Sequence, residues 1–268
     1  MAVFGIASAA SGILDLIWGE LEPAHQPLQA WGDRIPGVTI LAYVVAVWLI
    51  AAGAAILWRR SMRFGAAALT ILYGIFILFP LPRFVTAPHF LGYRAAVYIG
   101  VTGNVCEQII LFVAAAVLWT SLSEQRSLSG RAALAARWTF GFCSVFFGLG
   151  NLTAIQTVVP SIPKWMPFGA TFWAVLTGAA FVLAGLAIIS GVQDVLAARL
   201  LGTMLLVFSV LALAPPIFAA PRDQVSWGAN AFNLTAVGAA WIIAEWLANR
   251  QQWIQHQEST YPGNPSLV

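Results

Sequence analysis

Two carboxylates inside apolar segments are the residues of this sequence best placed to do chemistry. Asp15 lies in the apolar run of residues 3–20, and Glu107 lies in the run of residues 95–119. A charged side chain inside a bilayer costs a few kcal/mol, so such residues mark functional sites and have partners. Each lies about 18 Å from the expected cytoplasmic end of its helix, so the two meet if their helices are neighbours. Because two close carboxylates cannot both stay ionised, they would form a proton-sharing pair or a cation site.

Each carboxylate belongs to a small, polar helical face, since residues three and four apart lie on one side of a helix. Small and polar residues are also the usual contact surface between helices in a membrane. The alternative interpretation is therefore that both faces only hold helices together. The two faces consist of Ser8, Ser11, Gly12 and Asp15 in one segment and of Asn104, Glu107, Gln108 and Leu111 in the other.

The composition identifies the solvent of this protein. The 268-residue chain is 60% hydrophobic and only 9% charged, with a mean hydropathy of +0.83. An ordinary soluble domain has about 25% charged residues, so the composition excludes a water-soluble globular protein, a disordered chain and a nucleic-acid binder. The lipid bilayer is the predicted surrounding. At about 20 apolar residues per spanning helix, the length accommodates about eight spans and no sizeable soluble domain.

Apolar segments separated by charged or proline-rich stretches predict an all-α integral membrane protein with eight transmembrane helices. The last residues, from 250 to 268, are polar and contain Pro262 and Pro265, which predicts a loose tail. The predicted helices are residues 3–20, 37–58, 64–80, 95–119, 138–158, 169–190, 200–217 and 228–248.

The second half of the chain repeats features of the first, which predicts two four-helix-bundle repeats. Each half crosses the membrane an even number of times, so both enter from the same face and the repeats are parallel. The predicted division is residues 1–120 for the first repeat, 121–137 for a cytoplasmic linker, 138–249 for the second repeat and 250–268 for a cytoplasmic tail. The matching positions include Phe4-Gly5 with Phe140-Gly141, Gly12 with Gly148, Gly53 with Gly185, Gly65 with Gly202, Pro80 with Pro215-Pro216, and Asn104 with Asn233.

In this alignment the intramembrane charges belong to the first half. Asp15 corresponds to Asn151 and Glu107 to Ala236, whereas Asn104 keeps its amide in Asn233. The first half is therefore the one predicted to be active. The candidate intramembrane site comprises Asp15, Asn104, Glu107 and Gln108, with Asn151 and Asn233 as the neutral counterparts.

The basic residues predict the orientation, because cytoplasmic loops of membrane proteins carry an excess of Lys and Arg. Alternate loops divide the 13 basic residues eight to five, which predicts an inner (plasma) membrane protein with both termini in the cytoplasm. The larger group consists of Arg59, Arg60, Arg63, Arg126, Arg131, Arg137, Arg199 and Arg250, and the smaller of Arg34, Arg83, Arg94, Lys164 and Arg222.

The remaining candidates lie outside the two carboxylate faces. Arg83, His89 and Arg94 could form an extracytoplasmic patch for an anion or a quinone carbonyl, and the alternative is that they snorkel to lipid headgroups. Cys106 and Cys143 are predicted to differ in depth by about 12 Å, too far for a disulfide. No histidine or cysteine pattern has metal-ligand spacing, so no metal site is predicted.

Several hydrophobic motifs resemble the DoxX family of small four-helix membrane proteins. The resemblance implies two such bundles fused in one chain, and the family's founding members are associated with a thiosulfate:quinone oxidoreductase. Relatives often have a polar or histidine residue before the proline that ends their third helix, where this chain has Phe79 and Ala214. The motifs are Gly185-Leu186-Ala187-Ile188-Ile189-Ser190, Ala197-Ala198-Arg199-Leu200, Met204-Leu205-Leu206-Val207-Phe208, Pro215-Pro216, and the stretch from Trp138 to Gly150.

Three classes of function follow, and the sequence leaves open whether the protein is an enzyme. The first is a membrane subunit or binding module, linked to quinone and working with a membrane or redox partner subunit. The second is a small-solute or proton-coupled carrier that uses Asp15 and Glu107, and the third is a structural or assembly protein without chemistry.

An apolar cleft with Arg83 or Arg94 at its mouth would favour quinone, and unpaired charges lining a water-filled cavity would favour the carrier. A packed interior with both acids hydrogen-bonded would favour the structural role.

Overall fold

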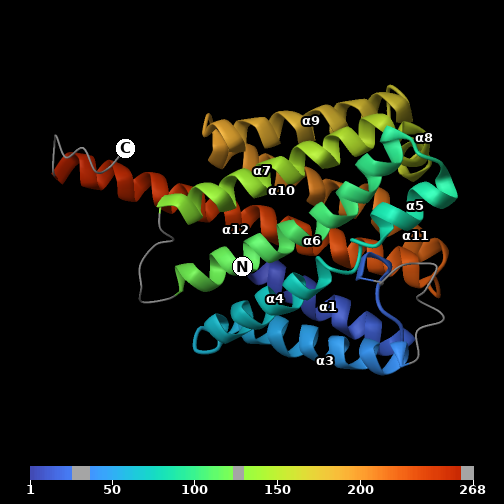
Figure 1. Ribbon diagram of the computed structural model, residues 1–268, viewed down its shortest axis with the longest axis horizontal. Coiled ribbons are helices and arrows are strands. Elements are labelled where there is room, and N and C mark those ends of the chain that lie inside the picture. Colours follow the sequence, from blue (N-terminus) through green and yellow to red (C-terminus); the bar gives the residue numbers. More distant parts are fainter. Residues whose placement is uncertain (26–36, 123–129, 261–268) are drawn as a thin grey trace.

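The structure is a computed structural model that describes residues 1–25, 37–122 and 130–260 (Figure 1). Within these ranges every regular element is helical, as the sequence predicts. Each predicted apolar segment contains one long helix. These helices are α1 (Ala2–Trp18), α3 (Val38–Leu57), α4 (Met62–Phe76), α6 (Ala95–Ser121), α7 (Gly130–Thr153), α9 (Ala170–Ser190), α10 (Asp194–Phe208) and α12 (Gln224–Thr260).

Shorter helical pieces, which the sequence did not predict as separate elements, complete the chain. Figure 1 places α5, α8 and α11 at the same end of the bundle. They arise where proline interrupts a long helix, as at Pro82 before α5 and Pro215 in α11, because proline lacks the N–H that continues a helix. The pieces are η1 (Pro23–His25), α5 (Arg83–Leu91), α8 (Ile155–Val158), η2 (Val159–Ser161), the π-helical turn η3 (Ser209–Leu213) and α11 (Ala214–Ala219).

The described helices identify a multi-pass membrane protein. Six spans are long and apolar enough to cross a bilayer, and α1 and α4 are shorter apolar helices of 17 and 15 residues. The outer surface is correspondingly apolar: Ile17 is 67% exposed, Phe64 73% and Leu183 67%. A soluble protein rarely exposes a contiguous surface of this kind, whereas lipid tails cover it without cost.

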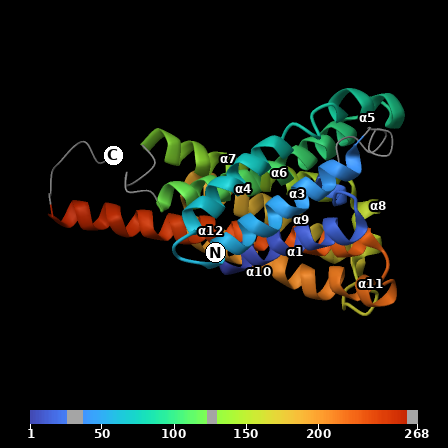
Figure 2. The same ribbon diagram turned by 90° about the horizontal axis from the view of Figure 1, so that it is seen from below.

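The helices pack in an ordered pattern. In the first part of the chain α1 packs against α3 and α4 against α6, and in the second part α7 packs against α9 and α10 against α12. Two further contacts, α1 with α12 and α6 with α7, join the two parts, and α6 and α12 meet between them. Figures 1 and 2 show the resulting elongated bundle, with α12 reaching beyond it at one end.

Close approach at small residues holds the α1–α3 and α7–α9 pairs together. A Cβ atom added to Gly5 would lie 2.8 Å from the carbonyl oxygen of Gly53, and one added to Gly141 would lie 2.8 Å from that of Gly185. Lipid provides little hydrophobic drive between helices, so backbone contact at such positions supplies the attraction. The small residues of these helices are therefore packing residues.

Several helix boundaries differ from the predicted ones, among them the start of α10, which lies at Asp194 rather than at the predicted residue 200. Helix α7 begins at Gly130, so residues 130–137 of the predicted linker are helical, and α12 continues through the predicted tail to Thr260. Both stretches are rich in good helix formers, alanine and arginine in the first and glutamine in the second. The side chain of Gln251 also donates a hydrogen bond to Asp194 Oδ1 (2.7 Å), which ties the extension to α10.

The predicted depths of the two cysteines are wrong. The side chains of Cys106 on α6 and Cys143 on α7 interact, and both are buried free thiols. The earlier start of α7 explains the difference. Cys143 is 13 residues after Gly130 and Cys106 is 15 residues before Ser121, so both lie about 20 Å along their helices from the connection between them.

A matched pair of substitutions in α7 tests the packing. A Cβ at Gly148 would lie 2.5 Å from the Gly178 carbonyl oxygen, whereas one at Gly150 would meet nothing within 4 Å. We expect Gly148→Ala to destabilise the protein by about 1–3 kcal/mol through overpacking and Gly150→Ala to be neutral or stabilising. Thermal unfolding in mild detergent measures both, and equal stability of the two variants would contradict the assigned α7–α9 contact.

Candidate functional site

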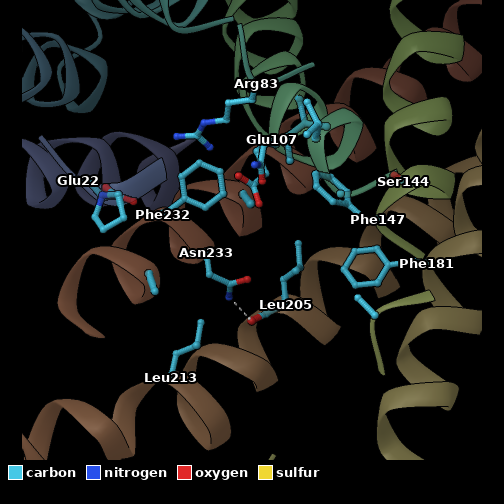
Figure 3. A pocket seen from close by; sticks show the side chains of 18 of the residues that line it. Glu22, Arg83, Glu107, Ser144, Phe147, Phe181, Leu205, Leu213, Phe232 and Asn233 are labelled. Carbon is cyan, nitrogen blue, oxygen red and sulfur yellow. Dashed lines mark hydrogen bonds between the residues drawn. The ribbon is translucent and has the colours of Figure 1, made fainter. Parts of the chain in front are cut away.

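The main cavity of the described part lies at the end of the bundle where α6 and α12 begin. Its volume is about 830 Å³, within the range of small-molecule sites. Most lining side chains are apolar, and the charged ones are Glu22, Arg83 and Glu107. Figure 3 shows Arg83 and Glu107 pointing into the same space, with the ring of Phe232 beside them. The polar side chains of the wall are Asn104, Ser144 and Asn233.

Arg83 and Glu107 form the charged wall of this cavity. Arg83 is the first residue of α5, and Glu107 lies on α6, against which α5 packs. Burial lowers the pKa of the Arg83 guanidinium, and the negative charge of Glu107 opposes that shift. The two side chains are thus electrostatically coupled, and each reduces the cost of burying the other.

A tight turn after α1 brings Glu22 back to Asp15. Gly19 ends the helix with φ 67°, a left-handed conformation that glycine adopts without strain, and its N–H bonds to the Asp15 carbonyl oxygen. The backbone N–H of Glu22 then donates to Asp15 Oδ1 at 2.7 Å. This hydrogen bond holds the segment after α1 inside the bundle, where Leu21, Glu22 and His25 are buried.

Glu22 is a buried acid that faces the cavity. Its side chain is 1% exposed, neither carboxyl oxygen has a partner within hydrogen-bond geometry, and His25 Nδ1 is 3.9 Å from Oε2. Burial raises the pKa of the carboxyl well above its usual value, as do the charges of Asp15 and Glu107, while the nearby Ser11 hydroxyl opposes the rise. Burial therefore favours the protonated, neutral form of Glu22.

His25 is a neutral partner for this acid. Its ring is 2% exposed and stacks on Phe76, with ring centroids 4.3 Å apart. Burial lowers the pKa of the imidazole to about 3. His25 therefore contributes no positive charge to Glu22 at neutral pH.

Asn233 supports the opposite wall. Its Nδ2 donates to the carbonyl oxygen of Leu205 (2.7 Å) and to Ser209 Oγ (2.8 Å), as Figure 3 shows for Leu205. The backbone N–H of Ser209, at the start of the π-helical turn Ser209–Leu213, already bonds to the Leu205 carbonyl oxygen, so Asn233 adds a side-chain donor there. This amide thus stabilises a break in α10 next to the cavity.

The structure brings some of the predicted residues together and separates others. Asn104, Glu107, Arg83 and Asn233 line the cavity. Asp15 and Gln108 are buried but lie outside the lining, Asn151 is half-buried on α7, and His89 and Arg94 are exposed. Arg34 and Arg126, used for the predicted orientation, lie outside the described residues.

The helices of Asp15 and Glu107 are not main packing partners, and a third acid, Glu22, interacts with both carboxyls. Helix α1 packs mainly against α3 and α12, and α6 against α4, α7 and α12. Glu22 interacts electrostatically with both Asp15 and Glu107. Sequence reasoning missed Glu22 because its segment is short and polar. Only its position seven residues after Asp15, beyond a glycine, could have indicated the turn.

The comparisons with known proteins identify no relative. No family model matches the chain, and no curated protein or solved structure matches it. Among residues 1–25, 37–122 and 130–260, no group of three or more His, Cys, Asp or Glu side chains could hold a metal ion. The site is therefore interpreted from its own geometry.

The role of Asp15 can be separated from its charge. Asp15→Ala removes the acceptor of the buried Glu22 N–H, so we expect a loss of about 1–3 kcal/mol. Asp15→Asn keeps an acceptor oxygen and should be close to wild type in thermal unfolding. A large loss in Asp15→Asn would instead make the charge itself architectural and contradict a functional role for it.

The buried imidazole predicts sensitivity to acid. The unfolded chain binds a proton at His25 below about pH 6.5, whereas the folded state resists protonation until about pH 3. Stability is therefore complete above pH 6.5 and falls as the pH drops, by on the order of 2 kcal/mol at pH 5. His25→Phe keeps the aromatic stacking, so its unfolding temperature should fall less than that of wild type between pH 7 and pH 5. His89→Phe, on the exposed side of α5, is the control, and unchanged acid sensitivity in His25→Phe would refute the assignment.

Proposed function

We propose that this protein is a membrane binding module. It holds a small lipophilic molecule with a polar head in the cavity at the end of the bundle where α6 and α12 begin. The single observation that carries the proposal is the cavity itself, about 830 Å³ of space with apolar walls and a few polar groups at one side. Ligand sites typically combine these features. A structural protein without chemistry would have a filled interior, because a void forfeits packing energy.

The proposed architecture is eight transmembrane helices in two parallel DoxX-like repeats, residues 1–120 and 138–249. Three observations support it. The helix contacts of the two halves correspond, and so do the glycine contacts, since Gly5 with Gly53 and Gly141 with Gly185 occupy matching positions. The third is the cavity wall, where positions of α6 pair with those 129 residues later in α12. The paired lining residues are Ala96 with Val225, Gly100 with Ala229, Asn104 with Asn233, and Glu107 with Ala236.

This symmetry gives the cavity a proposed orientation. If the positive-inside bias sets the topology, both termini are in the cytoplasm and the inner (plasma) membrane is the site of the protein. The end of the bundle with α5, α8 and α11 (Figure 1) then faces the extracytoplasmic side. A ligand would enter the cavity from that side or from the outer leaflet.

Quinone is the first ligand class for this module, and it is the class that the DoxX resemblance implies. A quinone offers two carbonyl acceptors on a flat apolar ring. Arg83 and the Asn104 amide can donate to a carbonyl at the polar side of the cavity, and the phenylalanine walls fit the ring. A membrane or redox partner subunit would be needed to supply electrons.

A proton-coupled carrier is the second candidate. The observation that favours it is the row of Asp15, Glu22 and Glu107, which connects a buried acid to the cavity. Intramembrane acids in series are typical of proton pathways. A carrier would require the cavity to open alternately to the two sides.

Blocking the cavity tests the binding function. Gly100 lines the cavity and Gly103 does not, yet an added Cβ would meet nothing within 4 Å at either position. We expect Gly100→Phe to reduce the affinity for a short-chain quinone at least about tenfold, equivalent to about 1.4 kcal/mol, and Gly103→Phe to bind as wild type. Quenching of intrinsic tryptophan fluorescence in nanodiscs measures the affinity, and equal binding by both variants would refute the cavity as the site.

The same titration separates the candidates. Arg83→Gln should weaken quinone binding, whereas Arg94→Gln, at the start of α6 and outside the cavity lining, should leave it unchanged.

Native mass spectrometry of the wild type in mild detergent then identifies retained small molecules and co-purifying subunits. A retained quinone or redox partner supports the quinone-linked subunit. Absence of quinone binding, with proton-dependent flux in proteoliposomes that Glu107→Gln removes, supports the carrier.

A further inference from the structure

The charges that line the cavity do not balance. Its charged side chains are one guanidinium, Arg83, and two carboxyls, Glu22 and Glu107. Arg83 and Glu107 are coupled to each other. Glu22 is therefore an additional acid, for which the cavity wall supplies no second cation.

Within residues 1–25, 37–122 and 130–260, the elements packed around Glu22 present no positive charge to its carboxyl. Asp15 and Ser11 face it from α1, Tyr73 from α4 and Glu107 from α6. On α12, a Cβ at Gly228 would lie 2.8 Å from Glu22 Cγ, so that helix contacts the side chain through a glycine. Among the described residues, the imidazole of His25 lies 3.9 Å from Oε2, and burial keeps that imidazole neutral. The carboxyl is 1% exposed and has no hydrogen-bond partner at either oxygen.

The rest of the wall suits a hydrophobic cation. Four phenylalanine rings line the cavity, from α7, α9 and α12, and Figure 3 shows three of them around its space. Aromatic faces attract cations, most strongly where water is excluded. A buried carboxyl beside aromatic walls is thus a site for a positive charge carried on an apolar body. The four rings are those of Phe140, Phe147, Phe181 and Phe232.

We propose that the cavity binds a lipophilic organic cation with Glu22 as its counter-ion, and that each cation bound releases one proton from Glu22. The exchange is balanced: the O–H bond of the Glu22 carboxyl breaks, its proton leaves to water, and the carboxylate pairs with the cation. This inference rests on the proposed function of the cavity as a binding site and adds a second class of ligand to the neutral quinone.

The empty and loaded states both avoid an unpaired buried charge. Without a ligand, burial favours the neutral, protonated form of Glu22, which avoids the cost of desolvating a carboxylate. With a cation bound, the carboxylate has a partner of opposite charge in the same cavity. Proton and cation therefore compete for one group, and cation affinity rises with pH.

Tetraphenylphosphonium is the probe, because its charge is permanent and it cannot carry a proton itself. Titration of the wild-type protein in nanodiscs at pH 6, 7 and 8 should show affinity rising by up to about tenfold per pH unit. Calorimetry in buffers of different ionisation enthalpy should detect release of close to one proton per cation. Affinity independent of pH, or binding without proton release, overturns the proposal.

Variants of two neighbouring glutamates assign the exchange to Glu22. Glu22→Gln should weaken cation binding at least about tenfold at pH 8, about 1.4 kcal/mol, and abolish its pH dependence. Glu22→Asp should retain the pH dependence. Glu20→Gln is the matched control, since Glu20 is an exposed carboxylate of the same segment and lies outside the cavity lining. Wild-type binding and pH dependence in Glu22→Gln would overturn the assignment.

A neutral ligand distinguishes failure of this inference from failure of the binding function. A short-chain quinone should bind the wild-type protein, and thermal unfolding of Glu22→Gln close to that of wild type shows that the variant is folded. Quinone binding that Gly100→Phe removes, combined with no binding of tetraphenylphosphonium, rejects the cation site alone. Absence of both kinds of binding rejects the cavity as a ligand site and this inference with it.

Discussion

Direct backbone contact between helices is the constraint on which the rest of this structure depends. Lipid surrounds the bundle, so apolar side chains gain little by leaving it for a helix interface. Attraction must come from close packing, and it is strongest where a missing side chain lets one helix touch the backbone of another. Gly5 with Gly53 and Gly141 with Gly185 provide such contacts. They set the α1–α3 and α7–α9 pairs around which the other helices are arranged.

The cavity forms where this contact is lacking. Along α6 an added Cβ would meet nothing within 4 Å at Gly100 or Gly103, in contrast to the crowded glycines of α1 and α7. Helices α6 and α12 meet between the two halves, but their first turns line open space. The π-helical turn after α10, where Asn233 bonds to Ser209, and the prolines of α11 make the segment Asp194–Ala219 irregular at the same end. A glycine that faces a neighbouring helix therefore gives close packing, whereas Gly100, which faces no neighbour, leaves open space.

The turn after α1 decides which charged groups line the cavity. The left-handed Gly19 and the hydrogen bond from Glu22 N–H to Asp15 fold a polar segment into an apolar interior. This places an acid, and the neutral His25, among groups that carry no compensating charge for it. Asp15 therefore has an architectural task, which the packing interpretation anticipated. The consequence is chemical, because the turn adds Glu22 to the cavity lining.

The sequence by itself determined the solvent, the helical class and the position of each long apolar helix, because hydrophobicity and length depend only on composition along the chain. It also identified Glu107, Asn104 and Arg83, since polar groups next to apolar runs stand out without knowledge of the fold. Tertiary structure alone decided that these three share a cavity with Glu22, that His89 and Arg94 face away from it, and that Cys106 meets Cys143. How deep a side chain lies and which side chains it contacts depend on how helices pack against one another. The burial of the short polar turn that carries Glu22 depends on the same packing. No single segment encodes that packing.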